Sequence, residues 1–175
     1  LHVSVSLRQI NSEIGGLVTT RSDALGEVPK LQSECRFVNI TGLPGCGKSV
    51  VLKEIASIAA SIGPILFLKS DRMEGKTWGA YATSLGLQNT NLHELLVEIE
   101  SSGTPTLFVD GVDRIDVNQR QVILDVLDAI FFDERHSNWN VVVTSRDQGL
   151  EAFRSWLGGA LVNKGGFRDF SVGPL

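Results

Sequence analysis

The feature that most constrains this chain is a glycine loop with the pattern G-x-x-x-x-G-K-S. Its residues are Gly42, Leu43, Pro44, Gly45, Cys46, Gly47, Lys48 and Ser49, and Val50 follows them. A short β-prone run, Phe37 to Thr41, precedes the loop, and apolar residues at helical spacing follow it from Ser49 to Ile62. A strand before the loop and a helix after it indicate a built anion site rather than a chance glycine-rich turn.

The glycines and the start of the helix together predict that residues 42–50 bind the phosphates of a nucleotide. Without a Cβ, glycines let successive backbone N–H groups converge on phosphate oxygens. The helix N-terminus adds free donors and partial positive charge. Lys48 is expected to reach the β- and γ-phosphates, and the Ser49 hydroxyl is expected to bind Mg²⁺. These residues do not distinguish ATP from GTP as the nucleotide.

Further apolar runs alternate with helical patterns along the rest of the chain. The expected strands are Ile65 to Lys69, Thr106 to Asp110, Val141 to Ser145 and Phe167 to Val172. The expected helices are Trp78 to Leu85, Asn91 to Glu100, a stretch capped by Asp116 with an apolar stripe from Val122 to Phe131, and Leu150 to Leu157. Such alternation predicts a three-layer αβα P-loop NTPase fold with a parallel sheet of about five strands. We expect it to span residues 36–175, after an N-terminal arm and short helix in residues 1–35.

Two carboxylates follow the predicted strand from Thr106 to Asp110. Parallel strands place ligands at their carboxyl ends, so Asp110 is expected beside the glycine loop. There it would hold Mg²⁺ together with Ser49, with water between the carboxylate and the ion. Asp113 is a candidate to polarise the attacking water or to position Mg²⁺ indirectly. The alternative for Asp113 is a loop acid that pairs with Arg114.

A basic residue closes the next predicted strand, in the run Val141-Val142-Val143-Thr144-Ser145-Arg146. Its guanidinium would complement the charge of a terminal phosphate. The alternative is a surface arginine paired with Asp147. Arg146 therefore joins Asp110 and Asp113 as the third candidate catalytic residue.

Charge and composition narrow the class of protein. The net charge of −4 argues against a broad nucleic-acid-binding face, which needs clustered Lys and Arg. Two cysteines are too few for a disulfide framework, and we see neither a signal peptide nor an apolar run long enough to span a membrane. We therefore expect a cytoplasmic domain. His2, His93 and His136 show no metal-binding spacing, so no zinc site is predicted, and residues 133–136 are interpreted as a solvated helix end.

The segments GLPGCGKS, TLFVDGVDRI and VVVTSR, in this order, resemble the STAND class of P-loop NTPases, which includes NACHT and NB-ARC domains. The resemblance covers about residues 36–175. It implies that residues 42–49 are Walker A, Asp110 is Walker B, Asp113 is the second acidic position and Arg146 is the sensor. It also implies an ATP/ADP switch that acts with other modules of a full-length protein and self-associates in a nucleotide-dependent way. We expect the lid and the later modules to lie outside this chain.

Two departures from the motifs suggest slow hydrolysis. Arg114 stands where many STAND relatives have Glu, and Gly111 follows Asp110 where AAA-type motors carry a catalytic Glu. An AAA-like motor or DNA-associated ATPase is the first alternative, and it would need that Glu, an arginine finger and a basic track. A small-molecule kinase is the second alternative. It would need an Arg-rich lid, and residues 147–175 offer only Arg154 and Arg168.

Overall fold

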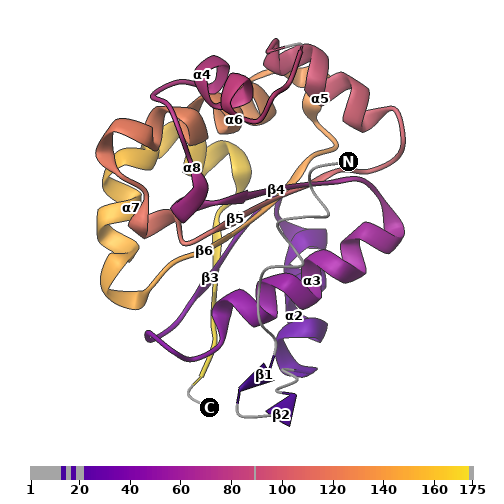
Figure 1. Ribbon diagram of the computed structural model, residues 1–175. Helices are drawn as coiled ribbons and strands as arrows, with labels where there is room; N and C mark the ends of the chain where they lie inside the picture. Colours follow the sequence, from indigo (N-terminus) through magenta and orange to yellow (C-terminus); the bar gives the residue numbers. More distant parts are fainter. Residues whose placement is uncertain (1–12, 15–16, 19–21, 89, 174–175) are drawn as a thin grey trace.

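A computed structural model describes residues 13–14, 17–18, 22–88 and 90–173 of the chain. Its centre is a parallel five-stranded sheet in the order β4-β5-β6-β3-β7 (Figure 1). The strands are β3 (Phe37–Thr41), β4 (Ile65–Lys69), β5 (Thr106–Asp110), β6 (Asn140–Thr144) and β7 (Arg168–Ser171). A separate antiparallel pair is formed by β1 (Glu13–Ile14) and β2 (Leu17–Val18). The three-layer α/β fold predicted from the sequence is confirmed, and β6 lies between the loop-bearing strand β3 and the acidic strand β5.

Helices cover both faces of the sheet, as Figure 1 shows. On one face lie α2 (Ser22–Glu34) and α3 (Lys48–Ile62), and the other face carries α4 (Trp78–Ser84), α5 (Leu92–Glu100), α6 (Arg120–Phe132), α7 (Leu150–Leu157) and α8 (Gly159–Gly165). Side chains along each strand alternate between the two faces. In β5, for example, Phe108 packs in the core with α3, whereas Leu107 and Val109 pack in the core with α6.

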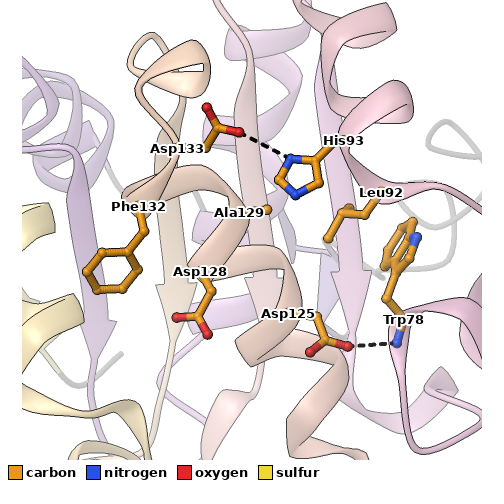
Figure 2. Close-up of a pocket in the computed structure, with 8 residues that line it drawn as sticks. All are labelled: Trp78, Leu92, His93, Asp125, Asp128, Ala129, Phe132 and Asp133. Carbon is orange, nitrogen blue, oxygen red and sulfur yellow. Dashed lines mark hydrogen bonds and ion pairs between the residues drawn. The ribbon is translucent and has the colours of Figure 1, made fainter.

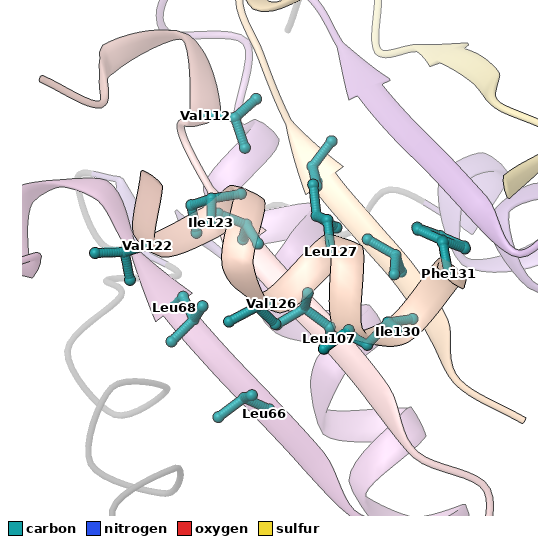
Figure 3. Packing of buried hydrophobic residues seen from close by; sticks show 14 of the residues in the cluster. Leu66, Leu68, Leu107, Val112, Val122, Ile123, Val126, Leu127, Ile130 and Phe131 are labelled. Carbon is teal, nitrogen blue, oxygen red and sulfur yellow. The ribbon is translucent and has the colours of Figure 1, made fainter. Parts of the chain in front are cut away.

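The predicted apolar stripe of α6 is buried against β4 and β5 (Figure 3). The stripe consists of Val122, Ile123, Val126, Leu127, Ile130 and Phe131. Full burial of one such side chain contributes about 1.5–3 kcal/mol, so this face anchors the layer. The helix begins later than predicted, because Asp116 caps the short 3₁₀ turn η3 (Val117–Gln119) through a 2.9 Å hydrogen bond from the Asn118 N–H.

The helix α8 was not predicted, because glycines flank it on both sides. It forms because Leu161 is buried in the core and because Gly165 lies against two aromatic rings. A Cβ at Gly165 would lie 2.9 Å from the Cβ of Phe37, so only glycine allows this approach. The helix ends at Gly166, whose φ of 64° is left-handed.

The structure describes only part of the predicted N-terminal arm and short helix. Residues 1–12, 15–16 and 19–21 of the expected arm lie outside the described residues, and α2 occupies the place of the expected short helix. Within the described part of the chain, no helix has the length and apolar character that a bilayer crossing requires.

Candidate functional site

Most of the predicted site residues surround a cleft of about 360 Å³ at the carboxyl ends of β3, β5 and β6, whereas Gly42, Leu43 and Cys46 do not line it. The residues that line it are Pro44, Gly45, Gly47, Lys48, Ser49, Val50, Asp110, Gly111, Asp113, Arg114, Thr144 and Arg146. All three predicted motifs thus meet in one cleft. Arg114 and Thr144 complete its wall, although the sequence analysis gave them no separate role.

The glycine loop turns from β3 into α3 through left-handed backbone conformations. Gly45 and Gly47 have φ angles of 81° and 88°, which side chains other than glycine rarely adopt. Gly42 is needed for a close approach as well, since a Cβ there would lie 2.8 Å from the Val172 carbonyl oxygen. The first turn of α3 carries no acidic residue, so no side chain of that turn neutralises the positive end of the helix dipole at the cleft.

The Lys48 side chain bends back over the loop that carries it. Its Nζ donates hydrogen bonds to the carbonyl oxygens of Gly42 at 2.7 Å and of Leu43 at 2.8 Å. Lys48 is therefore half-buried rather than fully exposed. A phosphate that enters the cleft has to compete with these two carbonyl groups for the ammonium group.

Asp110 lies at the centre of a network of hydroxyl groups. Its Oδ1 accepts hydrogen bonds from the Ser49 hydroxyl at 3.0 Å and from the Thr144 hydroxyl at 2.7 Å, and the Gly111 N–H donates to Thr144 Oγ1 at 2.7 Å. The residue is only 1% exposed. Within the described residues no basic side chain forms an ion pair with it, so a buried carboxylate has only hydroxyl partners.

The Ser49 and Asp110 oxygens fit a magnesium ion by chemistry and by spacing. Mg²⁺ prefers oxygen ligands in an octahedron at about 2.0–2.1 Å, which places neighbouring ligands about 2.9 Å apart. The two oxygens are separated by 3.0 Å. Their role as metal ligands stays a prediction.

Asp113 and Arg146 contact each other, which neither of their alternative interpretations anticipated. Asp113 Oδ2 accepts from Arg146 Nε at 2.6 Å, and Oδ1 accepts from the Arg146 backbone N–H at 3.2 Å. The Asp113 side chain is 1% exposed and that of Arg146 is 47% exposed. The pairings of Asp113 with Arg114 and of Arg146 with Asp147 are therefore not the ones observed. Gly149 packs on Asp113 so tightly that a Cβ there would lie 2.5 Å from the Asp113 Cβ.

A second polar network supports the cleft from the side of β7. Asn39, in the middle of β3, accepts from the Ser145 hydroxyl at 3.1 Å and donates to Asp169 at 2.9 Å, and Asp169 pairs with Arg154 at 2.6 Å. The sequence analysis missed this network. Its only signal was an asparagine within an otherwise apolar strand.

The interpretation of residues 133–136 as a solvated helix end is wrong for His136. Glu134 and Arg135 are exposed, but His136 is fully buried in the 3₁₀ turn η4 (Glu134–His136), and its ring lies next to that of His93 on α5. Ligand atoms of His93, Asp133 and His136 all lie within 4.8 Å of one another. Hydrogen bonds from Arg135 hold the pKa of Asp133 well below its usual range.

Comparisons with known proteins identify the class of domain. The model of the family described as "ATPase family associated with various cellular activities (AAA)" matches residues 38–152, well over half of the chain. The solved structure of Cdc6p from Pyrobaculum aerophilum is similar, with a TM-score of 0.61 and 15% identity over 97% of this chain and 49% of that one. A structure of Drosophila ORC bound to AT-rich DNA and Cdc6 is similar with a TM-score of 0.58 and 11% identity over 88% of this chain and 54% of that one.

These structural similarities concern the fold, because both identities are low. The chain spans about half the length of each of the two solved chains. No curated protein matches the sequence significantly.

Proposed function

Because this chain belongs to the AAA family of ATPases, we propose that it binds ATP with Mg²⁺ in the cleft around Lys48 and hydrolyses it slowly, as the nucleotide switch of a larger protein. The match supports the AAA-like alternative better than the STAND class. The AAA-like and STAND interpretations assign the same residues to the nucleotide site, because the same three strand ends surround a ligand in any domain with this sheet order. A STAND-specific signalling role has no support from the comparisons.

The observation that carries the proposal is the position of Asp110. This buried carboxylate lies 3.0 Å from the Ser49 hydroxyl and has no basic partner among the described residues. A buried acid without a counter-charge is costly unless a cation neutralises it. Mg²⁺, when bound here, would neutralise charge on the β- and γ-phosphates. Ser49 and Asp110 are the residues proposed to hold it.

The remaining cleft residues are proposed to orient the nucleotide. The start of α3 is proposed to supply backbone N–H groups to the phosphates, although the N–H groups of Cys46 and Val50 already donate to the carbonyl oxygens of Leu43 and Gly47. Lys48 exchanges its two carbonyl partners for phosphate oxygens. Arg146 lines the same cleft, where it can pair with a terminal phosphate in place of Asp113. ATP offers that terminal phosphate and ADP does not.

Slow hydrolysis follows from the contacts of the acidic residues. Gly111, not a glutamate, follows Asp110. Asp113, the other candidate to activate water, is buried, and its two carboxylate oxygens each accept a hydrogen bond from Arg146. Asp113 can act on water only after Arg146 moves, so we propose that this ion pair limits turnover.

The partners of the full-length protein are also a matter of proposal. One similar structure is of a complex bound to AT-rich DNA, so the expectation that nucleic acid is not a partner has no support from the comparisons. We propose that other modules, rather than this acidic domain alone, make any such contact. Nucleotide-dependent self-association is compatible with the family and stays a proposal.

A magnesium titration of wild type and Asp110→Asn tests the assignment. In wild type, we expect Mg²⁺ to raise the affinity for ATP. In Asp110→Asn this increase should be about tenfold smaller, which corresponds to about 1.4 kcal/mol. Asp71→Asn is the matched control, because Asp71 is an exposed acid in the 3₁₀ turn η1 (Ser70–Arg72) that follows β4, and it does not line the cleft. Identical magnesium curves for wild type and Asp110→Asn would refute the role of Asp110.

A further inference from the structure

A group of potential metal ligands lies at the opposite end of the sheet from the cleft. His93 is on α5, and Asp133 and His136 lie between α6 and the start of β6. His93 Nδ1 lies 3.4 Å from His136 Nε2 and 3.4 Å from Asp133 Oδ2. The side chains come from two segments, since His93 and His136 are 43 positions apart, and packing of α5 beside α6 and η4 brings them together.

The two distances from His93 Nδ1 match the edges of a metal coordination sphere, and the three ligand atoms all lie within 4.8 Å of one another. Zinc binds histidine nitrogen and carboxylate oxygen at about 2.0–2.2 Å in a tetrahedron, so neighbouring ligand atoms lie about 3.3–3.5 Å apart. Both distances from His93 Nδ1 fall in this range. Two imidazoles and one carboxylate suit zinc and related transition metals, whereas Mg²⁺ prefers oxygen ligands alone.

The surroundings of His136 fix its ring in the orientation that a ligand needs. Glu100 Oε1 lies 2.6 Å from His136 Nδ1 and, as a carboxylate, accepts the hydrogen bond. Nδ1 is therefore the protonated nitrogen, and the lone pair of Nε2 points toward His93. A carboxylate behind a histidine is the usual support of a metal-bound imidazole.

Arg36 fixes the backbone of the same turn. Its guanidinium donates to the carbonyl oxygens of His136 at 2.8 Å, Trp139 at 2.9 Å and Ile130 at 3.1 Å. The segment between α6 and β6 is thus tied to the start of β3. Such support reduces the entropy that a ligand set loses when it binds an ion.

Access to the group is open on one side. Figure 2 shows His93 and Asp133 facing each other at the rim of a pocket of about 520 Å³. Asp125 and Asp128 line the same pocket and add negative charge. Arg135 makes four hydrogen-bond contacts with Asp133, two to each carboxylate oxygen, so its side chain, which is 65% exposed, has to release Oδ2 before that oxygen binds a metal.

We propose that His93 Nδ1, His136 Nε2 and Asp133 Oδ2 bind one zinc ion, with water from the pocket as the fourth ligand. The ion takes the place of the proton between the two imidazoles and links α5 to the turn before β6. The proposal does not depend on the nucleotide site.

Cobalt binding tests the proposal, because Co²⁺ reports tetrahedral nitrogen and oxygen coordination by its visible absorption. The full chain is freed of metal with a chelator and titrated with Co²⁺, and Zn²⁺ then displaces the cobalt. We expect one ion per chain in wild type. Removal of one ligand in His93→Ala or Asp133→Asn should weaken Zn²⁺ binding at least tenfold, since loss of a mere supporting partner weakens it about 10–100-fold.

Two controls separate this site from others. Glu134→Gln removes a neighbouring acid that is not a ligand, and Asp110→Asn removes the acid of the nucleotide cleft. Both should bind Zn²⁺ as wild type does. His93 is 47% exposed, so His93→Ala should fold, which circular dichroism verifies. A wild-type chain that binds no Zn²⁺, equal affinity in His93→Ala, or loss of binding in Asp110→Asn alone would each overturn the proposal.

Discussion

The two ends of the sheet hold polar groups in different ways. At the carboxyl ends of β3, β5 and β6, the cleft is built from a glycine loop, short hydroxyl side chains and two buried acids, Asp110 and Asp113, whereas Lys48 and Arg146 remain partly exposed. At the amino ends of β3 and β6, His136 is fully buried and depends on Glu100 from α5 and on Arg36.

This difference predicts how each end responds to substitution. Groups at the cleft can change ligand affinity with little effect on folding, because water can reach them when a partner is lost. At the other end, loss of one partner leaves a polar group in the interior, and the cost falls on stability. Substitutions at the two ends should therefore separate binding from folding.

The largest effect is expected for His136→Ala. It removes a buried ring and leaves the partly buried Glu100 without its 2.6 Å contact, so the free energy of unfolding should fall by about 3 kcal/mol. Urea denaturation followed by circular dichroism measures this. His93→Ala is the control, and without added metal it should change stability by less than about 0.5 kcal/mol, because His93 is 47% exposed. Equal losses of stability in the two variants would contradict the expected difference between buried His136 and exposed His93.

Lys48→Ala should have the next largest effect, on binding rather than folding. Loss of a charge-assisted contact to phosphate costs about 1.5–3 kcal/mol, so ATP affinity should fall by at least about tenfold. Stability should change by less than about 1 kcal/mol, since the hydrogen bonds of Lys48 reach backbone carbonyls of a loop at the surface.

Calorimetry measures the affinity, and Lys76→Ala serves as the control, because Lys76 is an exposed lysine outside the cleft. Unchanged ATP affinity in Lys48→Ala would mean that the glycine loop does not bind the phosphates. A large loss of stability would instead mean that the cleft and the opposite end respond alike.

The smallest effect is expected for Arg146→Ala. Arg146 is 47% exposed, and Asp113, although its side chain is 1% exposed, lines the cleft, so water can reach the Asp113 carboxylate once Arg146 is removed and the substitution should cost no more than about 1 kcal/mol. ADP affinity should stay the same, whereas any preference for ATP should fall about fivefold, because only ATP has the γ-phosphate. Competition binding with both nucleotides measures the ratio. Arg154→Ala, which removes an arginine paired with Asp169, should leave the ratio unchanged.

The sequence predicted the sheet and the cleft well because their signals are local. The strands β3, β4 and β5 were predicted with the bounds observed, since each is an apolar run between turn or loop residues. The glycine loop and Asp110 end such strands, and the parallel order then brings them together. The roles of these residues in binding and hydrolysis remain predictions.

The features that were missed depend on tertiary contacts. His93 and His136 are 43 positions apart and meet only when α5 packs beside the turn after α6, so no spacing rule could find them. The pairing of Asp113 with Arg146 likewise joins two loops that are 33 positions apart. Both arginine alternatives considered from sequence were neighbours in the chain, and local proximity was misleading in each case.

The central claim is that the cleft around Lys48 and Asp110 binds ATP with magnesium. The most direct test is calorimetric titration of ATP into the wild-type chain, once with excess Mg²⁺ and once with a chelator. We predict saturable binding at one site per chain that weakens clearly when Mg²⁺ is removed. No binding under either condition, or the same affinity in both, would contradict the account.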